Sequence, residues 1–264
     1  MKLSVKMILG AGLAATLMSC SDKAADKGDF KFLLDEFADV KVMRYQVPGW
    51  DALSLQQKEY VYHLAEAAKY GRDIIWMQNC RYNLDIRKML ENALENYSGD
   101  RTSEDYAKFE AYAKRVFFSN GIHHHYAEDK FMPECPKEYF QAVMESVGES
   151  ERCAELIDVI YDPAVLPQRK STDKSGDIVA ESAVNFYEGV TKAEVEKFYA
   201  AMTDPSDKTP VSYGLNSKVV KGSDGVIRED VYKVGGLYGP ALEKIIAELE
   251  KAALVAENQT QKDY

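Results

Sequence analysis

Apolar residues at helical spacing, opened by capping motifs, are the feature that most constrains the fold of this 264-residue chain. Ser54-Leu55-Gln56-Gln57 is a capping box, in which the first and last side chains each bond the other residue's backbone N–H. Apolar residues then recur every three or four positions, and Gly71 is expected to end this helix. The pattern predicts a mainly helical domain.

The same signals predict further helices along the chain. A second capping box, Thr191-Lys192-Ala193-Glu194, opens one of them, and a last amphipathic helix places Leu242 and Leu249 inward. A stretch rich in Pro, Ser and Lys is expected to form an exposed loop at 162–176. The other helices are predicted at 84–97, 104–118, 137–147, 150–161 and 191–202.

The pattern changes from helical to extended between residues 211 and 234. Residues 211–213, 217–221 and 226–234 are predicted to be extended, and Gly222-Ser223-Asp224-Gly225 is predicted to be the turn of a hairpin. The expected fold class is therefore α+β, mainly helical, with a small antiparallel β element near 211–234.

Charge and cysteine content limit the possible partners. The 33 basic and 43 acidic residues give a net charge of −10 at pH 7, and the sequence shows no basic stripe. Nucleic acid is therefore not an expected partner. Cys80, Cys135 and Cys153 lack C-x-x-C spacing and are odd in number, so they are predicted to be buried or partly buried thiols.

The amino terminus has the pattern of a bacterial export signal. Lys2 and Lys6 precede an apolar run, Met7–Leu17, which is too short to span a bilayer as a helix. Leu17-Met18-Ser19-Cys20 is the pattern that lipoprotein processing recognises. Ordinary cleavage that leaves Cys20 as a free thiol is the alternative.

Lipoprotein processing predicts three parts in the chain. Residues 1–19 are the signal peptide, lipidated Cys20 begins a polar tether at 20–29, and the folded region occupies 30–264. The expected location is the cell envelope, with the lipid in a membrane and the protein at the periplasmic face or the cell surface.

The segment Phe118–Tyr126, FSNGIHHHY, concentrates three of the four histidines. If it is extended, His123 and His125 share one face and His124 and Tyr126 share the other. Three interpretations follow: two imidazoles that bind a metal, an exposed strand that contacts a ligand, or a structural loop without a ligand. His63, the fourth histidine, is expected to be packed or hydrogen-bonded in a helix.

Common catalytic motifs are absent from the sequence. It has no H-E-x-x-H zinc motif, no G-x-S-x-G nucleophile motif, and no P-loop or dinucleotide-binding motif. No catalytic residue and no metal ligand is therefore predicted in this chain.

Two segments resemble a known peptidase family. They are FADVKVMRYQVPGW at 37–50, continued by LSLQQKEYVY at 53–62, and FSNGIHHHY at 118–126, followed by Asp129-Lys130-Phe131. These segments resemble dipeptidyl peptidase III in its bacterial, Bacteroides-type lipoprotein form. The resemblance extends over roughly residues 30–260.

The resemblance implies the amino-terminal lobe of a two-lobed zinc peptidase that releases dipeptides from the amino ends of short peptides. Family members take their zinc ligands from H-E-x-x-G-H and a later helix with paired Glu residues, and neither motif is in this sequence. Zinc is thus expected in the full-length family but not in this chain alone. The missing catalytic lobe is an expected partner.

The resemblance also implies where peptides bind. The family segment that matches Asn120–Tyr126 borders the substrate cleft, and an aromatic side chain there contacts bound peptide. Asn120, His123, His125 and Tyr126 are therefore the candidate substrate-binding residues, with Tyr126 as that aromatic.

The expected function is that of a truncated amino-terminal part, inactive alone, which supplies one wall of a peptide cleft. One alternative is a stand-alone, non-enzymatic lipoprotein that binds peptides or a partner. Another is that a separate chain supplies the zinc lobe.

Overall fold

The computed structural model describes residues 30–264. The predicted signal peptide, Cys20 and the tether to residue 29 lie outside the described residues. Within the described part, no helix combines the length and the apolar character needed to cross a membrane.

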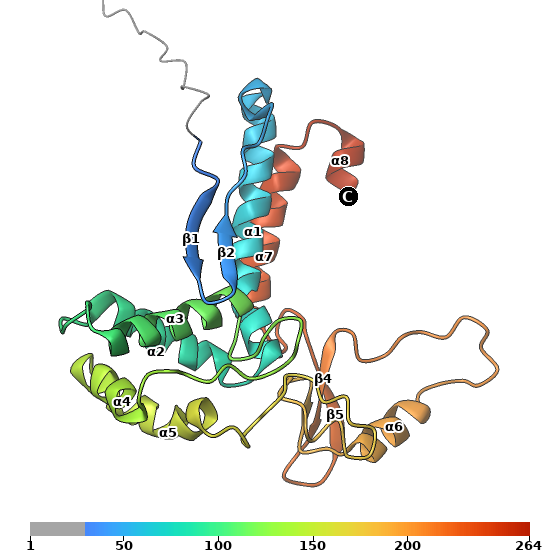
Figure 1. The fold of residues 1–264 in the computed structure, drawn as a ribbon. Helices are drawn as coiled ribbons and strands as arrows, with labels where there is room; N and C mark the ends of the chain where they lie inside the picture. Colours follow the sequence, from blue (N-terminus) through green and yellow to red (C-terminus); the bar gives the residue numbers. More distant parts are fainter. Residues whose placement is uncertain (1–29) are drawn as a thin grey trace, which may run out of the picture.

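Two long helices form an arm that projects from the rest of the fold (Figure 1). α1 (Leu55–Asn79) packs along α7 (Gly239–Leu254), and Nδ1 of His63 lies 2.8 Å from Oε2 of Glu248 across this contact. The prediction that His63 is hydrogen-bonded is thus confirmed. A hairpin of β1 (Leu33–Phe37) and β2 (Val40–Met43) lies beside α1. A 3-10 turn (Trp50–Ala52) connects this hairpin to the start of α1.

The predicted end of α1 at Gly71 is wrong. The helix continues for eight residues beyond Gly71, and it includes the buried ring of Trp76. A Cβ at Gly71 would lie 3.8 Å from Cδ1 of Ile245 in α7, so this glycine sits at the contact between the two helices. The contact with α7 and the burial of Trp76 outweigh the roughly 1 kcal/mol by which glycine disfavours a helix interior.

Four helices surround the main core: α2 (Asn83–Asn96), α3 (Glu104–Ser119), α4 (Lys137–Ser146) and α5 (Ser150–Tyr161). Their bounds agree with the predicted ranges to within one residue at each end. Their largest fully buried side chains include Ile86, Met89, Leu90, Phe109, Phe140, Met144 and Ile160.

The three cysteines of the described region are buried thiols, as predicted. Burial raises the pKa of Cys80 to about 11. The thiol is therefore protonated and unreactive at neutral pH, because the thiolate is the nucleophile.

A three-stranded sheet forms the second part of the fold. Its order is β3 (Tyr187–Glu188), β4 (Ser217–Lys221) and β5 (Ile227–Val231), with β3 parallel to β4 and β5 antiparallel to it. α6 (Lys192–Ala200) begins at the predicted capping box, and its Val195 packs with Val190 and Val219. The predicted hairpin is confirmed.

Several short elements differ from the prediction. Residues 211–213 form no strand, α6 ends two residues early, and β1, β2, β3 and α8 (Gln259–Asp263) were not predicted. Each missed element is five residues long or shorter. A segment that short carries too few residues to establish a period.

Candidate functional site

The candidate site is a tight turn, residues 120–131, which we call the histidine turn. α3 ends at Ser119, and the next residue, its C-cap Asn120, has left-handed backbone geometry (φ 53°). Two short extended arms then pair: the N–H of His124 donates to the carbonyl of Asp129 (2.8 Å), and the N–H of Phe131 donates to that of Ile122 (2.8 Å). The chain reverses between them, at residues 125–127.

The segment from His123 to Tyr126 is therefore not extended, and the condition under which His123 and His125 would share one face is not met. The side chain of His124 explains the reversal, because its Nδ1 accepts hydrogen bonds from the backbone N–H groups of Tyr126 (3.1 Å) and Ala127 (2.9 Å). A side chain that bonds to the backbone two and three residues later stabilises a turn, as Asx turns do. His124 is thus a structural residue of the turn.

Two asparagines at the junction of α1 and α2 hold the start of the turn by hydrogen bonds to its backbone. The amide of Asn79 donates to the carbonyl of Asn120 (3.1 Å), and Oδ1 of the buried Asn83 accepts from the N–H of Ile122 (3.2 Å). Gly121 makes this close approach possible, since a Cβ there would lie 2.1 Å from Nδ2 of Asn83.

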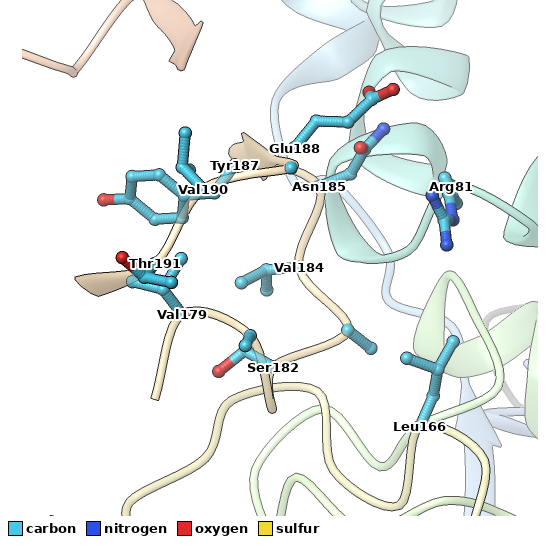
Figure 2. A pocket seen from close by; sticks show the side chains of 13 residues that line it. Arg81, Leu166, Val179, Ser182, Val184, Asn185, Tyr187, Glu188, Val190 and Thr191 are labelled. Atoms are coloured by element: carbon cyan, nitrogen blue, oxygen red, sulfur yellow. The ribbon is translucent and has the colours of Figure 1, made fainter. Parts of the chain in front are cut away.

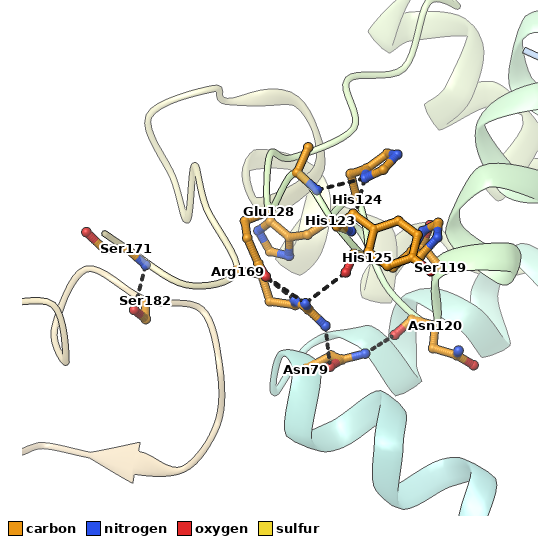
Figure 3. A network of polar contacts seen from close by, with 12 residues as sticks. Asn79, Ser119, Asn120, His123, His124, His125, Glu128, Arg169, Ser171 and Ser182 are labelled. Carbon is orange, nitrogen blue, oxygen red and sulfur yellow. Dashed lines mark hydrogen bonds and ion pairs between the residues drawn. The ribbon is translucent and has the colours of Figure 1, made fainter. Parts of the chain in front are cut away.

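An ion pair closes the other side of the turn (Figure 3). Nε and Nη2 of Arg169 donate to the two carboxylate oxygens of Glu128, at 2.7 and 2.8 Å. Nη2 also donates to the carbonyl of His125 (3.1 Å), and Nη1 donates to Oδ1 of Asn79 (3.3 Å). The Arg169 guanidinium lowers the pKa of Glu128, so the carboxylate stays ionised at neutral pH.

The predicted loop at 162–176 is irregular, but residues 167–169 in its middle are hydrogen-bonded to the histidine turn. The carbonyl of Pro167 accepts from the N–H of Lys130 (3.1 Å), and the N–H of Arg169 donates to the carbonyl of Glu128 (2.8 Å). The ammonium of Lys130 donates to the carbonyls of Val159, Asp162 and Val165. The loop is therefore part of the support for the histidine turn.

Replacing Arg169 by Leu is expected to lower the free energy of unfolding by about 2 kcal/mol, because a partly buried carboxylate loses its charged partner. Chemical denaturation measures this loss. The double variant Arg169→Leu with Glu128→Leu should recover part of it, since no carboxylate is then left without its partner. A single variant as stable as the wild type would contradict this role.

The four candidate binding residues do not share one environment. His123 is 1% exposed, and its Nε2 lies 2.8 Å from the carbonyl of Leu166, so its ring points into the protein. Asn120 contributes its carbonyl to the support of the turn. His125 and Tyr126 lie at the outer end, where Tyr126 is 83% exposed.

A row of aromatic rings continues from the turn across the surface. The rings of Tyr126 and His125 are 4.3 Å apart, those of His125 and Phe118 are 5.7 Å apart, and Phe118 meets Phe37 of β1 at 6.5 Å. Phe118 is itself exposed. Such a row can contact apolar or aromatic groups of a ligand.

The histidines do not gather as metal ligands. His123 bonds to a carbonyl, His124 bonds to two backbone N–H groups, and Nδ1 of His125 lies 3.4 Å from the hydroxyl of Ser119. Across residues 30–264, no three His, Cys, Asp or Glu side chains are grouped so as to hold a metal ion. These residues do not fit the zinc that the family resemblance implies.

Sequence reasoning missed the groups that hold the turn in place. Asn79, Asn83 and Arg169 lie 40 to 46 residues from His123–His125, and single Asn or Arg residues carry no local signal. Asn-Gly is a turn-prone pair, and the turn does start at Asn120-Gly121, where both residues have positive φ.

Comparisons with known proteins point to one family. No protein-family model matches the chain. Human dipeptidyl peptidase 3 is 25% identical over 256 residues, which cover 79% of this chain and 34% of the human protein. The rat protein of the same name is 23% identical over 255 residues, with the same coverage of both chains.

A solved structure of dipeptidyl-peptidase III from Corallococcus sp. strain EGB has a similar fold, with a TM-score of 0.50 at 19% identity. The match covers 82% of this chain and 30% of that one, and the α+β, mainly helical class is confirmed. The chain spans about a third of the length of the curated relatives that it matches. Over this partial region, the chain has a family relationship to dipeptidyl peptidase III.

Proposed function

We propose that this chain supplies a peptide-binding surface of the dipeptidyl peptidase III type, with the histidine turn as the contact region. The observation that carries the proposal is the exposed ring of Tyr126 on a turn whose backbone is fixed from both sides. The family relationship supports short peptides as the ligand.

The rigidity of the turn favours binding. A ligand loses less free energy to ordering when the groups it meets are already held in place. Tyr and His offer large contact areas with few rotatable bonds, and their polar atoms can bond to peptide N–H and C=O groups. His125 and Tyr126 provide these groups, whereas buried His123 acts from behind as a support.

Peptide hydrolysis is proposed to need the zinc-binding motif of the family, which is not in this sequence. The purified chain with zinc and a dipeptidyl arylamide should therefore release no arylamine, and measurable turnover would contradict the proposal. A stand-alone binding lipoprotein would also bind peptides, but it would stay inactive when a zinc-bearing lobe is added as a separate chain.

Replacing Tyr126 by Ala should weaken the binding of short peptides about tenfold, which corresponds to about 1.4 kcal/mol. Calorimetric titration with a five-residue peptide measures the effect. Tyr45→Ala is the matched control, because Tyr45 is 77% exposed and precedes the arm. Equal affinities of wild type and Tyr126→Ala would remove Tyr126 from the site.

The chain is further proposed to be a lipoprotein of the cell envelope, anchored through Cys20. In a bacterial host, the wild type should incorporate labelled palmitate and sediment with membranes, and Cys20→Ser should do neither. If Cys20→Ser sedimented with membranes as fully as the wild type, the proposal of a lipid anchor at Cys20 would be contradicted. Ser21→Ala, which leaves the cysteine in place, is the control.

A further inference from the structure

A pocket of about 370 Å³ lies beside β3 (Figure 2). Its apolar lining includes Leu166, Val179 and Val190, and its polar lining includes Arg81 and Asn185. A pocket of this kind suits a small ligand with one apolar group and one polar end.

Two polar side chains of the pocket keep free hydrogen-bond donors. Within residues 30–264, neither the guanidinium of Arg81, which is exposed, nor the side-chain amide of the half-buried Asn185 takes part in a hydrogen bond or an ion pair. The Arg81 guanidinium lies 4.9 Å from the centre of the Tyr82 ring, which restricts its orientation.

Three other polar side chains of the pocket, Ser182, Thr191 and Glu188, already have partners in the protein. The hydroxyl of Ser182 donates to the carbonyl of Ile178 and accepts from the N–H of Ser171. The hydroxyl of Thr191 bonds to Glu194, and the carboxylate of Glu188 pairs with Lys218. Among the described lining residues, Arg81 and Asn185 are therefore the side chains whose N–H groups can donate to a ligand.

The free donors define the chemistry of the ligand. A guanidinium presents planar, paired N–H groups that match the two oxygens of a carboxylate, and a side-chain amide can donate a further bond. Resting on the proposed function, we propose that this pocket binds the free carboxyl end of a short peptide whose last residue is apolar. Arg81 and Asn185 hold the carboxylate, and the valines and Leu166 contact the last side chain.

The pocket and the histidine turn share one support. Asn79, two residues before Arg81, bonds to Asn120 and to Arg169 of the turn. The N–H of Val184 in the pocket wall donates to the carbonyl of Arg169 (3.1 Å), and the N–H of Asn185 donates to that of Gln78 (2.9 Å). One rigid segment thus carries both places where a peptide is proposed to bind.

N-acetyl-leucine and N-acetyl-leucinamide test the pocket without involving the histidine turn. Titration of the full chain, followed by NMR, should show the acid binding at least tenfold more tightly than the amide. In Arg81→Gln, the affinity for the acid should fall to the affinity for the amide. Arg72→Gln, which removes an exposed arginine of α1 outside this pocket, should leave the difference unchanged.

Equal binding of acid and amide, absence of binding by both, or an unchanged preference in Arg81→Gln would overturn the inference. A five-residue peptide ending in leucine, as free acid and as amide, then separates this inference from the proposed function. Tyr126→Ala should weaken both forms equally, and Arg81→Gln should weaken only the acid. If only the Tyr126 effect appears, the pocket assignment fails and the turn remains the binding surface.

Discussion

Replacing Gly121 by Ala is expected to lower the free energy of unfolding by about 3 kcal/mol. The backbone φ of Gly121 is +150°, a region that residues with a Cβ rarely adopt. The added Cβ would also lie 2.1 Å from Nδ2 of Asn83. Asn83 has no space to withdraw, because it is fully buried and its Oδ1 accepts from the N–H of Ile122.

Urea denaturation of Gly121→Ala and Gly148→Ala separates the two causes. Gly148 also has a positive φ, +78°, but no atom lies within 4 Å of its Cβ position, so only the backbone strain applies there. Its alanine variant should lose about 1 kcal/mol. A Gly121→Ala variant that loses no more than Gly148→Ala would show that the turn and Asn83 are not in close contact.

Stability should fall as the pH is lowered from 6.5 to 4, and His123 should contribute up to about 3 kcal/mol of the loss. Burial of the ring lowers the pKa of His123 from 6.5 to about 4, although its bond to the Leu166 carbonyl opposes this shift. An imidazole with a lower pKa in the folded state stabilises the fold fully above pH 6.5. That contribution is lost as the pH falls through the interval toward 4, because the unfolded chain binds the proton more tightly.

His123→Gln isolates this contribution, since glutamine cannot titrate and its amide can still donate to Leu166. Carboxylates also titrate below pH 6.5, so the informative quantity is the difference between the two curves of unfolding free energy against pH. The wild type should lose more stability than the variant over this interval. Parallel curves would mean that His123 is not buried as a neutral ring.

The sequence alone predicted the elements whose signals are local and long. Capping boxes at Ser54 and Thr191 located two helix starts, and regular apolar spacing gave α2 to α5 to within one residue. Gly71 failed as a stop signal because its role depends on α7, about 170 residues later in the chain. No local pattern contains that information.

The candidate site shows the same limit. The resemblance selected Asn120–Tyr126, but it could not separate buried His123 from exposed Tyr126. That separation depends on the reversal at His125 and on Arg169, which arrives from a loop expected to be exposed. Contacts between distant segments decide which side chains of the turn face a ligand.

Photo-crosslinking tests the central claim most directly. A five-residue peptide with a benzophenone side chain is irradiated with the purified chain, and the attachment site is located by mass spectrometry. Attachment within residues 118–131, lost on competition with unlabelled peptide and reduced in Tyr126→Ala, is the predicted result. Competed attachment confined to the α1–α7 arm, with none in this segment, would contradict the claim that the histidine turn contacts peptides.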